Sequence, residues 1–253
     1  MLKKRIIPLL QLDQKKLVKT CKFTDPKYIG DPLNAIKIFN DKFVDELIIV
    51  DISQNKTNKD LDFNFLENLF SECFVPVTYG GGITNIDQAK KIMNLGAEKI
   101  CLNSSVIEDF KIVLEFSKYF GSQSVVVSVD VKKNFFKKYQ IYNNKFNRFE
   151  KNLNLNKYLK DLELAGAGEI LINSMNNDGV MKGMDEYLID LTKDQVNIPI
   201  IYLGGIGTLN DIKNIMKKKV NAISAGSFLV FYGELKAVLI SYPSEEFEKF
   251  IYD

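Results

Sequence analysis

The stretch Tyr79–Ile83, YGGGI, and its counterpart Tyr202–Gly207, YLGGIG, decide the fold that we expect for this chain. Each closes a short apolar run with consecutive glycines, and Gly81-Gly82-Ile83 matches Gly204-Gly205-Ile206 at an offset of 123 residues. A nearly constant offset over several matches indicates two similar halves rather than chance similarity. The same offset relates Glu46-Leu47-Ile48 to Glu169-Ile170-Leu171, Ile92-Met93 to Ile215-Met216, and Ser104 to Ser227.

Short apolar runs without polar alternation recur along both halves, which is typical of strands buried on both faces of a parallel sheet. Helical patterns lie between most of them, as in Asn85–Leu95, Tyr158–Ala165 and Leu209–Lys218, and we expect Gly96 and Gly166 at helix C-termini. Strands alternating with helices over residues 1–253 predict an α/β fold, one closed (β/α)8 barrel forming a single domain. The expected strands are Ile6–Leu10, Leu47–Val50, Val75–Thr78, Ile100–Leu102, Val125–Val129, Ile170–Ile172, Ile200–Leu203 and Ala222–Ser224.

Composition narrows the classes of function. A formal charge of +2 with dispersed basic residues argues against a nucleic-acid partner, and no run is long enough to span a membrane. Three cysteines without CxxC spacing and no signal-peptide pattern favour the cytoplasm. Because the chain has no histidine, we expect neither a histidine-based metal site nor a Ser-His system, and no cofactor is indicated. Acid–base chemistry then falls to carboxylates, lysines, tyrosines or cysteines.

Paired glycine-rich loops are predicted at the C-terminal ends of the strands, where barrels of this kind carry their active sites. Glycines let backbone N–H groups approach phosphate oxygens, so two symmetric loops predict a ligand with a phosphate at each end. The alternative is that these glycines only form tight turns. The candidate phosphate-binding residues are Gly81, Gly82, Asn103, Ser104, Asp178, Gly179, Gly204, Gly205, Gly226 and Ser227.

Asp130 ends the fifth predicted strand, and Gln11 takes the symmetric position on the first, because Arg5–Gln11 resembles Ser124–Asp130 at an offset of 119. The change of offset predicts a longer first loop in the second half. A carboxylate in the mouth can act as a general acid or base, although Asp130 could instead cap a loop. Asp51 and Asn176 are expected to line the same mouth, although Asn176–Gly179 could equally be a turn.

A charged set is predicted at the opposite end of the barrel, where Arg5, Glu46, Lys99 and Glu169 each lie at or just before the start of a strand. Two cations and two anions could form a ring that closes this end. From the residues alone a structural role is favoured, since this face usually serves stability.

The chain resembles, over nearly its whole length, the cyclase subunit of imidazole glycerol phosphate synthase. The resemblance rests on KRIIPLL, IGDP, VDELIIVDI, YGGGI, AEKICLNSS, SVVVSVD, GAGEILINSMNNDG and YLGGIG. It implies a bisphosphate or sugar ligand and a glutaminase partner that docks at the N-terminal face and sends ammonia through the barrel. It also implies that Arg5, Glu46, Lys99 and Glu169 form the gate of that channel.

One departure separates the chain from this family. The family pattern has two catalytic aspartates, and this chain keeps Asp130 but has Gln11 at the other position. The first loop reads Asp13-Gln14-Lys15 instead of the usual Asp-Gly. With these differences, the chain is similar to the cyclase-like proteins of surface-polysaccharide clusters, called WbuZ or AglZ proteins. That likeness implies acetamidino modification of a sugar with an N-acetyl-sugar amidotransferase.

Three functions are therefore open. The first is an ammonia-receiving, lyase-like synthase subunit of a glutamine amidotransferase that serves sugar amidation. The second is a cyclase of histidine biosynthesis that acts on a bisphosphate, with Asp130 and Gln11 as its catalytic positions. The third is a non-catalytic scaffold that activates a glutaminase.

Overall fold

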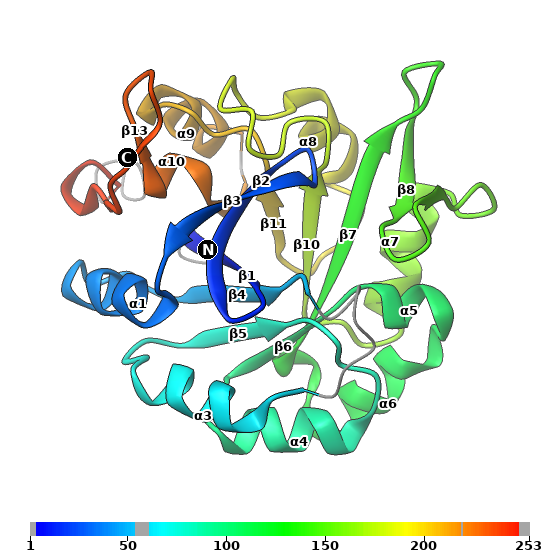
Figure 1. Cartoon of the computed structure of the whole chain (residues 1–253). Coiled ribbons are helices and arrows are strands. Elements are labelled where there is room, and N and C mark those ends of the chain that lie inside the picture. Colours follow the sequence, from blue (N-terminus) through cyan, green and yellow to red (C-terminus); the bar gives the residue numbers. More distant parts are fainter. Residues whose placement is uncertain (1–3, 54–60, 219, 248–253) are drawn as a thin grey trace.

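Eight parallel strands close into a barrel with helices around it, so the expected (β/α)8 fold is confirmed (Figure 1). The computed structural model describes residues 4–53, 61–218 and 220–247. Each barrel strand pairs in parallel with the next, and the last pairs with the first. The barrel strands are β1 (Arg5–Asp13), β4 (Leu47–Asp51), β5 (Val77–Gly80), β6 (Lys99–Leu102), β7 (Val125–Lys133), β10 (Glu169–Ser174), β11 (Ile200–Leu203) and β12 (Ala222–Ala225).

Most of the helices begin at a polar side chain that accepts a hydrogen bond from a free N–H group of the first turn. Asn85 accepts from Gln88 N, and Thr208 forms a reciprocal capping box with Asp211. Gly96 and Gly166 follow helix ends with φ of 119° and 99°, as expected for glycines at these positions. The helices are α1 (Pro32–Asp41), α3 (Phe63–Ser71), α4 (Ile86–Asn94), α5 (Ser104–Glu108), α6 (Lys111–Phe120), α7 (Leu155–Leu164), α8 (Glu186–Thr192), α9 (Leu209–Met216), α10 (Ser227–Val230) and the 3-10 turn η1 (Ser122–Ser124).

Two antiparallel hairpins interrupt the repeat at the same point of each half, and the sequence analysis did not predict them. In the first half, β1 continues into β2 (Lys16–Cys21) and β3 (Thr24–Gly30). In the second, β7 continues into β8 (Tyr139–Asn143) and β9 (Arg148–Phe149). The loop is longer in the second half, as the change of offset predicts. A small separate sheet, β13 (Phe231–Tyr232) with β14 (Ala237–Val238), follows α10.

The side chains inside the barrel are arranged in levels, because alternate residues of a strand point to the same face. Along β1 the inward residues are Arg5, Ile7, Leu9 and Gln11, while the intervening Ile6 and Leu10 pack outward against the helices. Three other strands, β4, β6 and β10, also have a charged residue at or just before their N-terminal end, and apolar residues follow it along the strand. The middle level is Ile7, Leu9, Ile48, Cys101, Val126, Leu171, Ile201, Leu203 and Ala222.

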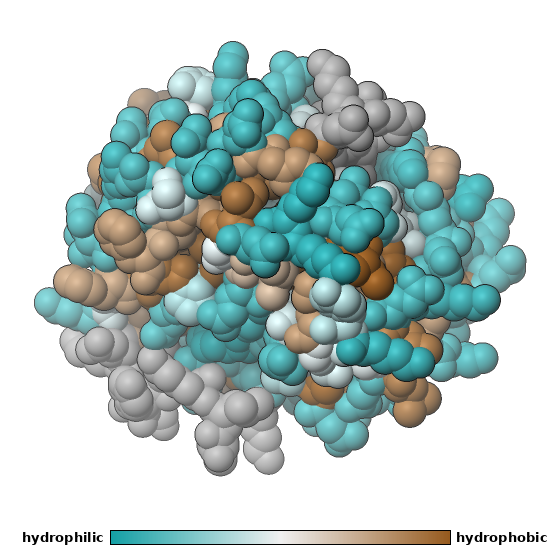
Figure 2. Space-filling view, turned by 90° about the horizontal axis from the view of Figure 1, so that it is seen from below, coloured by the Kyte–Doolittle hydropathy of each residue, from teal (hydrophilic) through white to brown (hydrophobic). Residues whose placement is uncertain are grey.

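Apolar residues on the face seen in Figure 2 form patches that hydrophilic side chains interrupt. Within the described parts of the chain, none of the helices has the length and apolar character that a membrane crossing requires. The same residues contain no cluster of histidine, cysteine, aspartate or glutamate that could hold a metal ion.

Candidate active site at the barrel mouth

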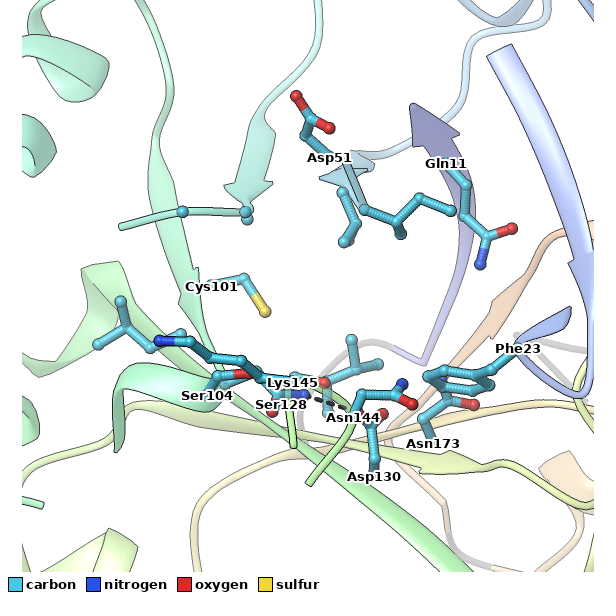
Figure 3. Close-up of a pocket in the computed structure, with 18 of the residues that line it drawn as sticks. Gln11, Phe23, Asp51, Cys101, Ser104, Ser128, Asp130, Asn144, Lys145 and Asn173 are labelled. Atoms are coloured by element: carbon cyan, nitrogen blue, oxygen red, sulfur yellow. Dashed lines mark hydrogen bonds between the residues drawn. The ribbon is translucent and has the colours of Figure 1, made fainter. Parts of the chain in front are cut away.

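A cavity of about 990 Å³ opens at the C-terminal ends of the strands. Its floor is the apolar middle level, represented by Leu9, Cys101, Leu171 and Leu203. Its walls come from the glycine-rich loop after β5, from Asn103-Ser104-Ser105 after β6 and from both hairpins (Figure 3). The residues that bring polar groups to this cavity include Gln11, Thr20, Asp51, Gly81, Gly82, Asn103, Ser104, Asp130 and Asn173.

Asp130 is buried where β7 leaves the barrel and continues into the second hairpin, and two amide side chains lie beside its carboxyl group. Asn103 donates to Asp130 Oδ2 at 2.9 Å, and a hydrogen bond from Asn173 also lowers the carboxyl pKa. Burial outweighs both amides and raises the pKa of Asp130 to about 7. A carboxyl group that titrates near neutrality can both give and take a proton at physiological pH.

Gln11 connects the mouth to the first hairpin. Its Oε1 accepts from the backbone N–H of Thr20 at 3.1 Å. The Thr20 hydroxyl lies 3.4 Å from the same oxygen and 3.2 Å from Asp178 Oδ2, to one of which it donates. Burial raises the pKa of Asp178, and Lys19 and Thr20 partly offset this. Gln11 therefore holds the hairpin in place and has no carboxyl group with which to exchange protons.

The first predicted phosphate loop is open to the cavity. Gly81 and Gly82 have φ of 125° and 68°, and a Cβ at Gly81 would lie 2.4 Å from the Asp51 carbonyl oxygen. Glycine is therefore required here by the approach of two backbones. Asn103 and Ser104 face the same space, with Ser104 as the first residue of α5. This loop offers room and backbone N–H groups for an anion.

The second predicted phosphate loop is closed by a side chain of the protein itself. Gly204, Gly205, Gly226 and Ser227 surround a space of about 20 Å³. Lys19 of β2 reaches into it, donates to Leu9 O at 2.6 Å, and lies 2.2 Å from where a Cβ of Gly226 would be. Burial lowers the pKa of Lys19 to about 8, against the attraction of Asp178. Asp178 and Gly179 line this same space.

Two site residues differ from what the sequence led us to expect. Asn176 lies in a turn and contributes to neither cavity, because its Oδ1 accepts from Lys133 N at 2.8 Å. Asn173 was missed, although it is buried beside Asp130 and its Oδ1 has no partner among the described residues. Its inward position could have been found from alternation, since Glu169, Leu171 and Asn173 share one face of β10.

The four charged residues predicted at the opposite end meet in a closed ring. Arg5 contacts Glu46 at 2.7 Å and Glu169 at 2.5 Å, while Lys99 contacts Glu46 at 3.3 Å and Glu169 at 2.9 Å. Burial alone would lower the pKa of Lys99, but Glu169 and Glu46 raise it above its ordinary value. Each cation is paired with both anions, so the ring keeps its charges paired although it is largely buried.

The fold and this mouth define a half-barrel-repeat (β/α)8 protein with a glycine-rich loop that opens to the cavity and a buried carboxyl group, that of Asp130, whose pKa is raised to about 7. The family model described as "Histidine biosynthesis protein" matches residues 5–236. The chain is 42% identical over 244 residues to a Pseudomonas aeruginosa protein with the provisional name imidazole glycerol phosphate synthase subunit hisF2, covering 96% of this chain and 97% of that one. It is 33% identical over 231 residues to the imidazole glycerol phosphate synthase subunit HisF of Dictyoglomus turgidum, covering 91% of each. The chain therefore belongs to the HisF-like family of imidazole glycerol phosphate synthase subunits.

Proposed function

We propose that this protein is the ammonia-receiving synthase subunit of a glutamine amidotransferase complex. A glutaminase docks at the N-terminal face, and its ammonia passes through the barrel to the mouth. The ammonia serves the acetamidino modification of a surface-polysaccharide sugar, together with an N-acetyl-sugar amidotransferase. Gln11 at the mouth replaces a family aspartate, while the ring at the opposite end is intact, and this combination supports amidation over a cyclase reaction.

The order of side chains inside the barrel is the observation that carries this proposal. A charged ring lies at one end, an apolar level follows, and the cavity opens beyond it. An apolar passage disfavours the ammonium ion, because burying an unpaired charge is far more costly than burying a neutral polar molecule. Neutral ammonia could pass once Lys99 leaves the ring, and it would then reach Asp130 and the unpaired Asn173 Oδ1.

A cyclase of histidine biosynthesis is the second candidate. Asp130 favours it, because a buried carboxyl with a pKa raised to about 7 suits proton transfer. A purely structural scaffold for a glutaminase is the third candidate. A scaffold of this kind would not need the cavity, nor the open phosphate loop at Gly81 and Ser104, which we call the phosphate cradle.

Replacing Lys99 tests ammonia passage in the complete complex with glutaminase and sugar acceptor. Lys99→Met should leave glutamine hydrolysis active while the amidated product per glutamine falls by about tenfold. Lys218→Met is the matched control, because Lys218 also pairs with two acids, Glu186 and Asp190, but these acids lie on α8 and not in the ring. An unchanged yield of amidated product per glutamine in Lys99→Met would contradict the hypothesis that Lys99 gates the passage of ammonia.

A cyclase assay with the family's bisphosphate substrate and excess ammonium salt separates the first two candidates. We expect no turnover by the unmodified protein, because Gln11 cannot exchange a proton. A Gln11→Asp variant, which restores a second carboxylate, runs beside it. Turnover by the unmodified protein at a rate typical of the family would establish a cyclase and remove the amidation proposal.

A further inference from the structure

The orientation of the Gln11 amide can be assigned from its surroundings. A backbone N–H can only donate, so the Gln11 atom that faces Thr20 N at 3.1 Å must be the oxygen. The NH₂ group therefore points the other way. Figure 3 shows the nitrogen directed toward the space above Phe23 and Asn173, with the oxygen turned away from it.

The Gln11 NH₂ group is a donor held in place, and it has no acceptor within the described part of the chain. The group is nevertheless almost enclosed, because Gln11 is only 8% exposed. Both hydrogen-bond contacts of the Gln11 side chain with the hairpin are made by Thr20, which is itself buried. A fixed donor that lines a cavity costs little further entropy when it binds a ligand acceptor.

The charges around Gln11 select the kind of acceptor. The carboxyl group of Asp130 lines the same cavity, and that of Asp178 is linked to Gln11 through Thr20. Lys19 is the cation on this side, but it faces Asp178 and is bonded to Leu9 O. Lys145 also lines the cavity, but it is paired with Glu108 at 2.7 Å. Because both of these cations already have partners among the described residues, a neutral oxygen, such as that of an amide or ketone carbonyl, suits this position best.

We propose that Gln11 is a substrate-binding residue whose NH₂ group donates to a neutral carbonyl oxygen of a phosphorylated ligand anchored at Gly81 and Ser104. The inference rests on the proposed function for its sugar substrate, and on the open loop at Gly81 and Ser104 for the phosphate. It does not depend on ammonia delivery. On this basis, the change from a carboxylate to an amide at residue 11 replaces proton exchange by carbonyl recognition.

Paired sugar phosphates test this by calorimetry at about pH 8. N-acetylglucosamine 6-phosphate carries an amide carbonyl, and 2-deoxyglucose 6-phosphate lacks that group but keeps the phosphate. We expect the unmodified protein to prefer the acetamido sugar by roughly three- to tenfold, the range of one hydrogen bond to a neutral group. Gln11→Glu keeps the acceptor for Thr20 but loses the NH₂ group, and it should reduce the preference to about onefold.

Gln88→Glu is the matched control, because Gln88 lines the same cavity and its Oε1 also accepts from a backbone N–H, that of Thr84 at 2.9 Å. The added charge should weaken the binding of both probes equally and leave the ratio of their affinities unchanged. Gln11→Met removes the NH₂ group without adding charge, and thermal unfolding checks that each variant folds. The Gln11 side-chain NH₂ signal in nitrogen-15 NMR spectra, identified by its loss in Gln11→Glu, should shift with the acetamido probe only.

The outcomes separate this inference from the proposed function. Equal binding of both probes, or a preference that survives in Gln11→Glu and Gln11→Met, overturns carbonyl recognition while leaving ammonia passage to the Lys99 experiment. Absence of binding by either probe overturns both the inference and the phosphate cradle.

Discussion

Asp130 is the residue whose surroundings give the sharpest dependence on pH. Its pKa is raised to about 7 by burial, while the same group in an unfolded chain titrates near 3.8. Below the unfolded pKa both states hold the proton. Between the two values the native state keeps a proton that the unfolded state has lost. The stability that this provides is lost as pH rises, by up to about 1.4 kcal/mol per unit.

We therefore expect Asp130→Asn to become more stable than the unmodified protein as pH rises. The difference in the free energy of unfolding should increase by about 1–3 kcal/mol between about pH 4 and about pH 8, measured by urea denaturation. Exposed Asp41→Asn, at the end of α1, should show no such trend. A difference that stays constant with pH would mean that Asp130 titrates as an ordinary carboxyl group.

At the scale of the element, the turns of the first hairpin contain residues whose side chains disfavour the left-handed backbone conformation found there. Gln14 and Lys15 have φ of 50° and 67°, and Lys22 and Phe23 have φ of 51° and 65°. Both are two-residue turns between paired residues, a geometry that usually selects Asn-Gly or Asp-Gly. For side chains other than glycine and asparagine, this region costs about 1–2 kcal/mol per residue.

Gln14→Asn should stabilise the protein, because asparagine tolerates a left-handed backbone better than glutamine does. We expect the free energy of unfolding to rise by a few tenths to about 1 kcal/mol. Gln123→Asn, at an exposed site without positive φ, is the control and should not stabilise. If Gln14→Asn lowered the melting temperature, the left-handed backbone at residue 14 would not be what limits the stability of this turn.

The same turns show why the sequence predicted the barrel but not its hairpins. Buried apolar runs and the repeat at Gly81 and Gly204 set the strands, because burial on both faces leaves a strong pattern. Asp13-Gln14-Lys15 lacks the Asn-Gly or Asp-Gly pair that usually indicates a hairpin turn, so the sequence did not predict β2. Lys19 and Thr20, which lie on β2, were therefore missed. The charged ring that includes Arg5 could be predicted, because its four residues lie at the starts of strands that the sequence had already indicated.

At the scale of the whole molecule, the two halves share one backbone plan but differ in what fills it. Asn103 and Gly226 precede short helices with similar dihedral angles, φ −140° and ψ −89° against φ −115° and ψ −82°. The loop beside Asn103 opens to about 990 Å³, whereas the loop beside Gly226 holds Lys19 and leaves about 20 Å³. The symmetry of the fold therefore does not predict equal binding by the two loops.

Placing a carboxylate at each loop measures this asymmetry. Ser104→Asp and Ser227→Asp put the same charge on symmetric first residues of α5 and α10, where an acidic side chain does not oppose helix formation. Ser104→Asp should weaken binding of inorganic phosphate by about tenfold or more, through repulsion in the open loop. Ser227→Asp should change it little, because Lys19 already fills the second loop and would pair with the new carboxylate. Equal losses in both variants would mean that Lys19 withdraws readily and that both loops bind phosphate. A loss confined to Ser104→Asp would mean that the molecule binds one phosphate and keeps Lys19 as the permanent occupant of the other loop.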